Sequence, residues 1–222
     1  MKLKRKKILE LIEEGENFNC EFKRKFSSPD KIAREMIAFA NSGGGFMLFG
    51  VDDNKDIVGV ESEKGEVELI NDTALNYCEP AIEYSIDYMP IEGKEVVIVE
   101  IPESKNKPHR IQDYLNEFDI NKAVVTIRVN DKSMQASKEM MRIMRAAAGG
   151  LVLKKYSIGE TEKRVFAFLE KHERISVKQL SGLINISERR ASRTLVKMVR
   201  ANLLAIHTKD NGEEFFTGIQ NS

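Results

Sequence analysis

The 222-residue chain is long enough to fold as one large domain or as two small ones. Its 41% hydrophobic and 32% charged residues are typical of a globular protein, and no apolar stretch approaches the roughly 18 residues needed to cross a bilayer. Met1–Lys7 is basic but is not followed by the apolar segment of a signal peptide, and two cysteines are too few for a disulfide framework. We therefore expect a cytoplasmic protein without a membrane partner.

The net charge of zero conceals an asymmetry along the chain. Residues 151–222 hold 13 Lys and Arg against 8 Asp and Glu, a net of +5, whereas the remaining residues hold 22 and 27, a net of −5. A basic C-terminal part on an acidic body favours an anionic partner, although a solvated surface with a chance bias would look the same.

The N-terminal part begins with a predicted helix over 2–14 and a strand over 18–22. Ser28 and Pro29 then start a helix that ends at Asn41, followed by three glycines and a nearly unbroken apolar run over 46–51. This run predicts a strand buried on both faces, and 57–60 reads as its returning partner. The glycines follow a helix rather than open one, and no GxxxxGK[ST] string occurs, which argues against a phosphate loop.

The next segments complete an α+β domain, which we place at residues 1–148. A helix is predicted over 65–78, a β-hairpin over 82–101, a strand over 123–129 and a helix from Ser137 to Ala148. We expect one mixed sheet of five or six strands with flanking helices. The long polar connection over 102–121 is either flexible or a phosphate-binding segment, with Lys107 and Arg110 as the predicted contacts. It also holds His109, which is either incidental or a candidate for acid–base chemistry.

Residues 149–159 are predicted to form a linker, and residues 160–222 have a different hydrophobic pattern from the part before it. Three short helical patterns precede two strand patterns that flank Asp210-Asn211-Gly212, a tight-turn signal. Three helices and a hairpin predict a small winged helix-turn-helix domain. In that fold the third helix enters the major groove, unless the domain serves protein contacts instead. The predicted nucleic-acid contacts on this helix and the wing are Arg189, Arg190, Ser192, Arg193, Lys197 and Lys209.

Several spaced motifs in the N-terminal part resemble one known family. They are Glu16-Asn-Phe-Asn-Cys-Glu-Phe-Lys23, Ala38-Phe-Ala-Asn41 with Gly44-Gly45, Gly50-Val-Asp-Asp53, Pro108-His109, Ile127-Arg-Val129 and Ala136-Ser137. In this order they resemble the Schlafen/AlbA-type domain, also described as a divergent AAA domain of transcriptional regulators. The resemblance covers roughly residues 8–148.

The resemblance also implies a site. Glu16, Glu21 and Asp53 match the carboxylates of ribonuclease-active Schlafen proteins, and Lys23 would contact the scissile phosphate. Three oxygen ligands could hold Mg²⁺ or Mn²⁺, which activates water, while the lysine would stabilise developing charge. Carboxylates at turns are also commonly solvated or act as caps.

Two functions follow from these features. The first is a DNA-binding transcriptional regulator that acts through the winged helix. The alternative is a metal-dependent endoribonuclease that cleaves structured RNA such as tRNA. Two lobes of this type surround RNA in animal Schlafen proteins, so a single copy predicts a homodimer.

Overall fold

The computed structural model describes residues 5–115, 117–149 and 156–219. The chain divides after Ala136 into two compact units, Met1–Ala136 and Ser137–Ser222. Helix α4 (Lys138–Ala148), which the sequence analysis placed at the end of the first domain, therefore belongs to the second unit.

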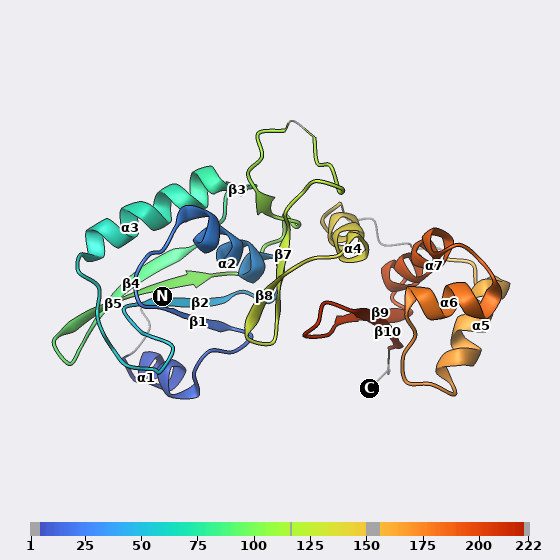
Figure 1. Ribbon diagram of the computed structural model, residues 1–222, viewed down its shortest axis with the longest axis horizontal. Coiled ribbons are helices and arrows are strands. Elements are labelled where there is room, and N and C mark those ends of the chain that lie inside the picture. Colours follow the sequence, from blue (N-terminus) through green and yellow to red (C-terminus); the bar gives the residue numbers. More distant parts are fainter. Residues whose placement is uncertain (1–4, 116, 150–155, 220–222) are drawn as a thin grey trace. The chain divides into compact units, whose positions relative to one another are not determined.

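A four-stranded mixed sheet forms the centre of the first unit, in the order β1-β2-β5-β4 (Figure 1). Its strands are β1 (Cys20–Lys23), β2 (Gly45–Phe49), β4 (Ser85–Ile91) and β5 (Lys94–Ile101). Strand β1 runs parallel to β2, and the other neighbours are antiparallel. The predicted α+β class is confirmed, as is the β4–β5 hairpin, but the sheet has fewer strands than we expected.

The missing strands pair elsewhere in the unit. Strand β3 (Cys78–Glu79) pairs with β6 (Arg110–Ile111), and β7 (Thr126–Val129) forms a hairpin with β8 (Lys132–Gln135). The predicted strand over 57–60 is also wrong, because its described residues make only the isolated bridge between Val51 and Ile57. Hydrogen bonds from the N–H groups of Val58 and Gly59 to the carbonyl of Gly50, and from Val60 to the carbonyl of Glu95, hold this segment in place without forming a strand.

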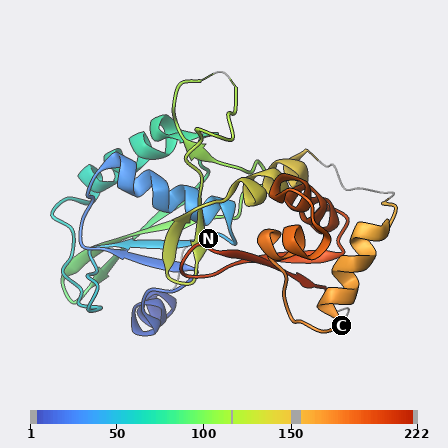
Figure 2. The same ribbon diagram turned by 45° about the vertical axis from the view of Figure 1, so that its right-hand side comes forward.

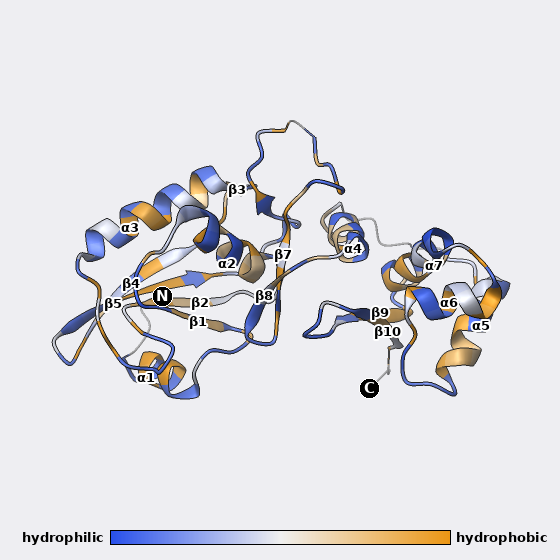
Figure 3. Ribbon diagram, viewed as in Figure 1, coloured by the Kyte–Doolittle hydropathy of each residue, from blue (hydrophilic) through white to orange (hydrophobic). Residues whose placement is uncertain are grey.

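Helices cover both faces of the sheet (Figures 1 and 2). On one face α2 (Pro29–Asn41) and α3 (Glu63–Asp72), which continues as a π-helical turn over Thr73–Tyr77, pack on Met47 and Phe49 of β2. On the other face α1 (Arg5–Glu14) packs on the alternate residue Leu48. This alternation confirms that β2 is buried on both sides, and the helices show the mixed blue and orange turns of amphipathic segments (Figure 3).

The described residues of the second unit form four helices and a hairpin. After α4 come α5 (Glu160–Leu169), α6 (Val177–Ile184) and α7 (Glu188–Arg200), then β9 (Leu204–Thr208) paired with β10 (Glu214–Gly218). A capping box at Ser176 starts α6, Asn185 ends it in the left-handed region with φ 52°, and the Ser187 hydroxyl accepts from the Arg190 N–H to start α7. Leu180, Leu195 and Phe216 are fully buried in the core of this unit.

The part of the chain that the structure describes contains no helix long and apolar enough to span a bilayer.

The glycines after α2 provide a test of the turn that leads into β2. Gly44 has φ 72°, and a Cβ there would lie 2.7 Å from the carbonyl oxygen of Ile101. Gly43 has no positive φ, and its nearest contact is the ring of Phe18 at 3.4 Å. We predict that Gly44→Ala lowers the free energy of unfolding in urea by about 1–3 kcal/mol. Gly43→Ala is the matched control, with a change of less than about 1 kcal/mol. Equal effects would contradict this account of the turn.

Candidate functional site

Glu21 lies on the edge strand of the sheet in the first unit. Its neighbours Cys20 and Phe22 point into the core beneath α1, so the pleat turns Glu21 to the opposite face. The residue is nevertheless 8% exposed, because other side chains cover it. A carboxylate buried this far requires a positive partner.

That partner is Arg128 on β7, whose side chain is fully buried. Its Nη1 donates to Glu21 Oε2 at 3.0 Å and to Glu35 Oε2 at 3.2 Å, and its Nη2 donates to the carbonyl oxygen of Asn17 at 2.8 Å. The guanidinium also lies 4.6 Å from the centre of the Phe39 ring. Arg128 thus points inward and joins β1, α2 and β7.

Glu35 completes this cluster from the middle of α2. Burial raises the pKa of its carboxyl group, the nearby negative charge of Glu21 raises it further, and the hydroxyl of Ser133 and the charge of Arg128 act in the opposite direction. The sequence analysis did not single out Glu35 or Ser133. One indication in the sequence that Glu35 belongs to the site is its position on the helix that leads into the family motif Ala38–Asn41.

The remaining members of the predicted site lie near Glu21 but in different surroundings. Lys23 pairs with Glu21 Oε1. Glu16 is exposed and accepts a hydrogen bond from the N–H of Phe22 at 2.9 Å through its Oε1. The pKa of Glu16 is raised chiefly by partial desolvation, and the negative charges of Glu21 and Asp53 contribute. Asp53 is exposed at the turn that follows β2. The structure thus brings these four residues within electrostatic range of one another.

The arrangement does not fit a divalent metal ion as it stands. Both oxygens of Glu21 already have cationic partners, Lys23 and Arg128. In the described ranges, no three Asp, Glu, His or Cys side chains are grouped closely enough to hold a metal. Oxygen ligands for Mg²⁺ or Mn²⁺ must converge on one point with their lone pairs free. Glu21 acts in this conformation as the buried counter-ion of Arg128.

His109 has a structural role. It is 2% exposed, its Nδ1 lies 2.7 Å from the carbonyl oxygen of Pro80, and its Nε2 lies 2.7 Å from Ser104 Oγ. Because a carbonyl only accepts, Nδ1 carries the proton and Nε2 accepts from the serine. Burial lowers the pKa of the imidazole, which keeps it neutral. Asn41, at the end of α2, holds the same segment by exchanging hydrogen bonds with the His109 backbone.

Two predicted phosphate contacts near His109 are unsuited to that task. Arg110 is 3% exposed and is paired with Glu79 at 2.7 Å and Asp113 at 3.0 Å, so its guanidinium is buried and occupied by protein carboxylates in this conformation. Lys107 donates to the carbonyl oxygen of Ser42 at 3.0 Å and to Glu103, with its side chain 17% exposed. Both side chains hold the connection between β5 and β7 in place.

In the second unit, α7 presents four exposed basic side chains, Arg189, Arg190, Arg193 and Lys197. Ser192 differs from this prediction: it is 4% exposed and donates its hydroxyl to Glu139 of α4. Lys209, at the turn between β9 and β10, is half-buried and pairs with Glu213 at 2.7 Å. The exposed face of α7 is therefore basic, whereas Ser192 anchors the helix to its neighbour.

The buried cluster generates a stability prediction. Arg128→Met leaves Glu21 and Glu35 without their main cationic partner, and we expect the free energy of unfolding to fall by about 3–5 kcal/mol. The control is Arg34→Met, which removes an exposed pair with Asp30 at 3.0 Å and changes the same quantity by less than about 1 kcal/mol. Adding Glu21→Gln and Glu35→Gln to Arg128→Met should restore part of the loss. Similar values for Arg128→Met and Arg34→Met in urea unfolding would contradict a buried charge cluster.

Comparison with known proteins places these features in a family. A Ureaplasma parvum serovar 3 protein, described as an uncharacterised ATP-binding protein, is 30% identical over 87 residues, which are 36% of this chain and 24% of that protein. The chain thus spans about a quarter of that relative's length. A solved Corynebacterium diphtheriae protein matches with 17% identity and a TM-score of 0.43, over 59% of this chain and 28% of that one.

The N-terminal domain of a RecG-related protein from Nitrosomonas europaea matches with 21% identity and a TM-score of 0.36, over 53% of this chain and 80% of that one. The model of the Schlafen, AlbA_2 family matches residues 16–137, which is more than half of the chain and includes Glu16, Glu21, Asp53 and Arg128. The matched range ends where the second unit begins. This protein is therefore a member of the Schlafen AlbA_2 family.

Proposed function

We propose that this protein is a DNA-binding regulator of transcription and that its second unit is a winged helix. The observation that supports the proposal best is the two-sided character of α7. Ala191, Leu195 and Met198 are fully buried on one side, while Arg189, Arg190, Arg193 and Lys197 are exposed on the rest of the helix surface. A capped helix with an exposed arginine face is suited to the major groove, where arginine binds phosphates and guanine edges.

The order of the surrounding elements agrees with this proposal. Helices α5, α6 and α7 are followed directly by the β9–β10 hairpin, whose turn carries Lys209. In a winged helix this hairpin lies beside the DNA and contacts its backbone. Because regulators with such domains commonly read two half-sites, we propose that the protein acts as a homodimer. The first unit would then supply dimer contacts or respond to a signal.

The proposal predicts salt-sensitive binding of duplex DNA. With a duplex of about three helical turns and fluorescence anisotropy as the readout, the logarithm of the affinity should fall linearly with the logarithm of salt concentration. Arg193→Ala should weaken binding roughly fivefold or more and make the slope shallower by about 0.9, the value of one phosphate contact.

The matched control for this experiment is Arg164→Ala, which removes an exposed arginine from α5 of the same unit. It should leave both the affinity and the salt slope unchanged. A wild-type protein that shows no salt-sensitive binding of duplex DNA would contradict the proposed function. Equal losses in the two variants would show a non-specific charge effect.

The second candidate function is metal-dependent cleavage of structured RNA. The proximity of Glu16, Glu21, Asp53 and Lys23 favours it, since the charges of the last three all act on Glu16. The ion pairs of Glu21 argue against it, because a metal would have to displace Lys23 or Arg128. The regulator is therefore the function that the geometry supports better.

An incubation with labelled tRNA distinguishes the two functions. We expect no cleavage in Mn²⁺, because Glu21 remains bound to its cationic partners. Asp53→Asn is the informative variant, since Asp53 is exposed and its loss leaves the buried cluster intact. Cleavage that needs Mn²⁺, stops with EDTA and is lost in Asp53→Asn would establish the nuclease. Cleavage that persists in Asp53→Asn would point to a contaminating ribonuclease.

A further inference from the structure

Helix α4 is fixed against α7 inside the second unit. The hydroxyl of Ser192 on α7 donates to Glu139 on α4, and Arg142 of α4 contacts both residues through Nη1, at 3.1 Å from Glu139 Oε1 and 3.4 Å from Ser192 Oγ. Met141 and Met144 are buried on the packed side of α4. The three helices and hairpin of a winged helix do not include α4, so its position beside the exposed arginine face needs an explanation.

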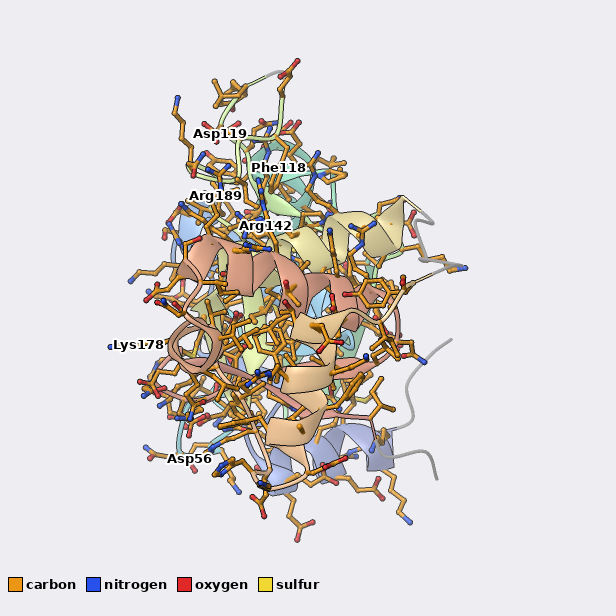
Figure 4. All side chains as sticks on the ribbon, turned by 90° about the vertical axis from the view of Figure 1, so that its right-hand side faces the viewer. Asp56, Phe118, Asp119, Arg142, Lys178 and Arg189 are labelled. Carbon is orange, nitrogen blue, oxygen red and sulfur yellow. The ribbon has the colours of Figure 1, made fainter. Side chains whose placement is uncertain are left out.

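A groove of about 450 Å³ lies along this junction. Lys138 and Arg142 line it from α4, and Arg189 and Arg193, four residues apart and hence on one face, line it from α7. Figure 4 shows the labelled Arg142 and Arg189 side chains near each other on their separate helices. Two acidic residues, Glu139 and Glu188, also line the groove, which leaves basic groups in excess by four to two.

The two acidic groups of the groove already have favourable interactions within the protein. The carboxylate of Glu139 is occupied by Ser192 and Arg142, and Glu188 lies in the first turn of α7, where the helix dipole favours a negative charge. The contacts that the described residues make with Arg142 go through Nη1, and a guanidinium has five N–H donors. Its Nε and Nη2 donors therefore remain for a planar, two-pronged contact with a phosphate.

We propose that α4 forms the second wall of a groove that binds the phosphate backbone of DNA, with Arg142 binding a phosphate beside those bound by Arg189 and Arg193. This inference rests on the proposed function and extends the DNA-binding surface beyond the winged helix itself. Phosphate contacts fix the register of a protein on the duplex without reading its sequence. Arg142 thus fixes the position of α7 on the duplex without itself reading the bases.

The experiment compares variants of the full chain in salt-dependent binding to duplex DNA. Arg142→Ala should make the slope of log affinity against log salt shallower by about 0.9, and it should weaken binding to unrelated duplex sequences by the same factor. Arg142→Gln removes the charge but keeps a hydrogen-bond donor for Glu139. It should therefore give the same slope change, and it serves as the test if Arg142→Ala proves to disturb folding. Arg164→Ala on α5 is the matched control and should match the wild-type slope.

The variants separate a failure of this inference from a failure of the proposed function. If the wild type binds duplex DNA and Arg193→Ala weakens binding while both Arg142 variants match the wild type, the α4 groove is overturned and the regulator stands. If the wild type binds no duplex DNA, both proposals fail. If a loss in the Arg142 variants appears with single-stranded RNA and not with the duplex, the groove binds nucleic acid but its assignment to DNA is wrong.

Discussion

A buried arginine joins elements of the first unit that are far apart in the sequence. Arg128 reaches Glu21 on the edge strand β1 and Glu35 on α2, and its second terminal nitrogen reaches the backbone before β1. Burying one cation and two carboxylates is unfavourable unless each has partners. The cluster meets this requirement only when the β7–β8 hairpin, α2 and β1 are all in place, so it links the formation of these elements.

This constraint also shapes the chemistry of the family motif. Glu21 is one of the residues that define the family motif in the sequence. In the structure it is paired with Arg128 and Lys23 and therefore helps to hold the fold together. Glu16 and Asp53 remain exposed beside it and are available to solvent or to a ligand. A ligand that engages all three carboxylates would have to open the ion pairs of Glu21, and this requirement favours a structural role for the cluster.

The second unit separates its attachments from its exposed charges in a similar way. Ser192 faces α4 and is buried, while Arg193, one position further, is exposed. One side of α7 thus packs on the core, an adjoining side bonds to α4, and the remaining surface carries the arginines. If α4 is part of the DNA-binding surface, the connection from the Schlafen AlbA_2 domain, which ends at Ala136, leads directly into that surface.

Local patterns in the sequence determined the α+β class, the buried strand β2, the β4–β5 hairpin and the three helices and hairpin of the second unit, because periodicity, caps and tight turns act within a few residues. The family motif also identified the neighbourhood of Glu16, Glu21 and Asp53. Only the tertiary structure decided which charges are available. Arg110, Arg128 and Ser192 look like surface residues by type, yet each is buried and paired with a carboxylate distant in sequence, namely Glu79, Glu21 and Glu139 respectively. Burial and pairing depend on those long-range contacts, which a single sequence does not contain.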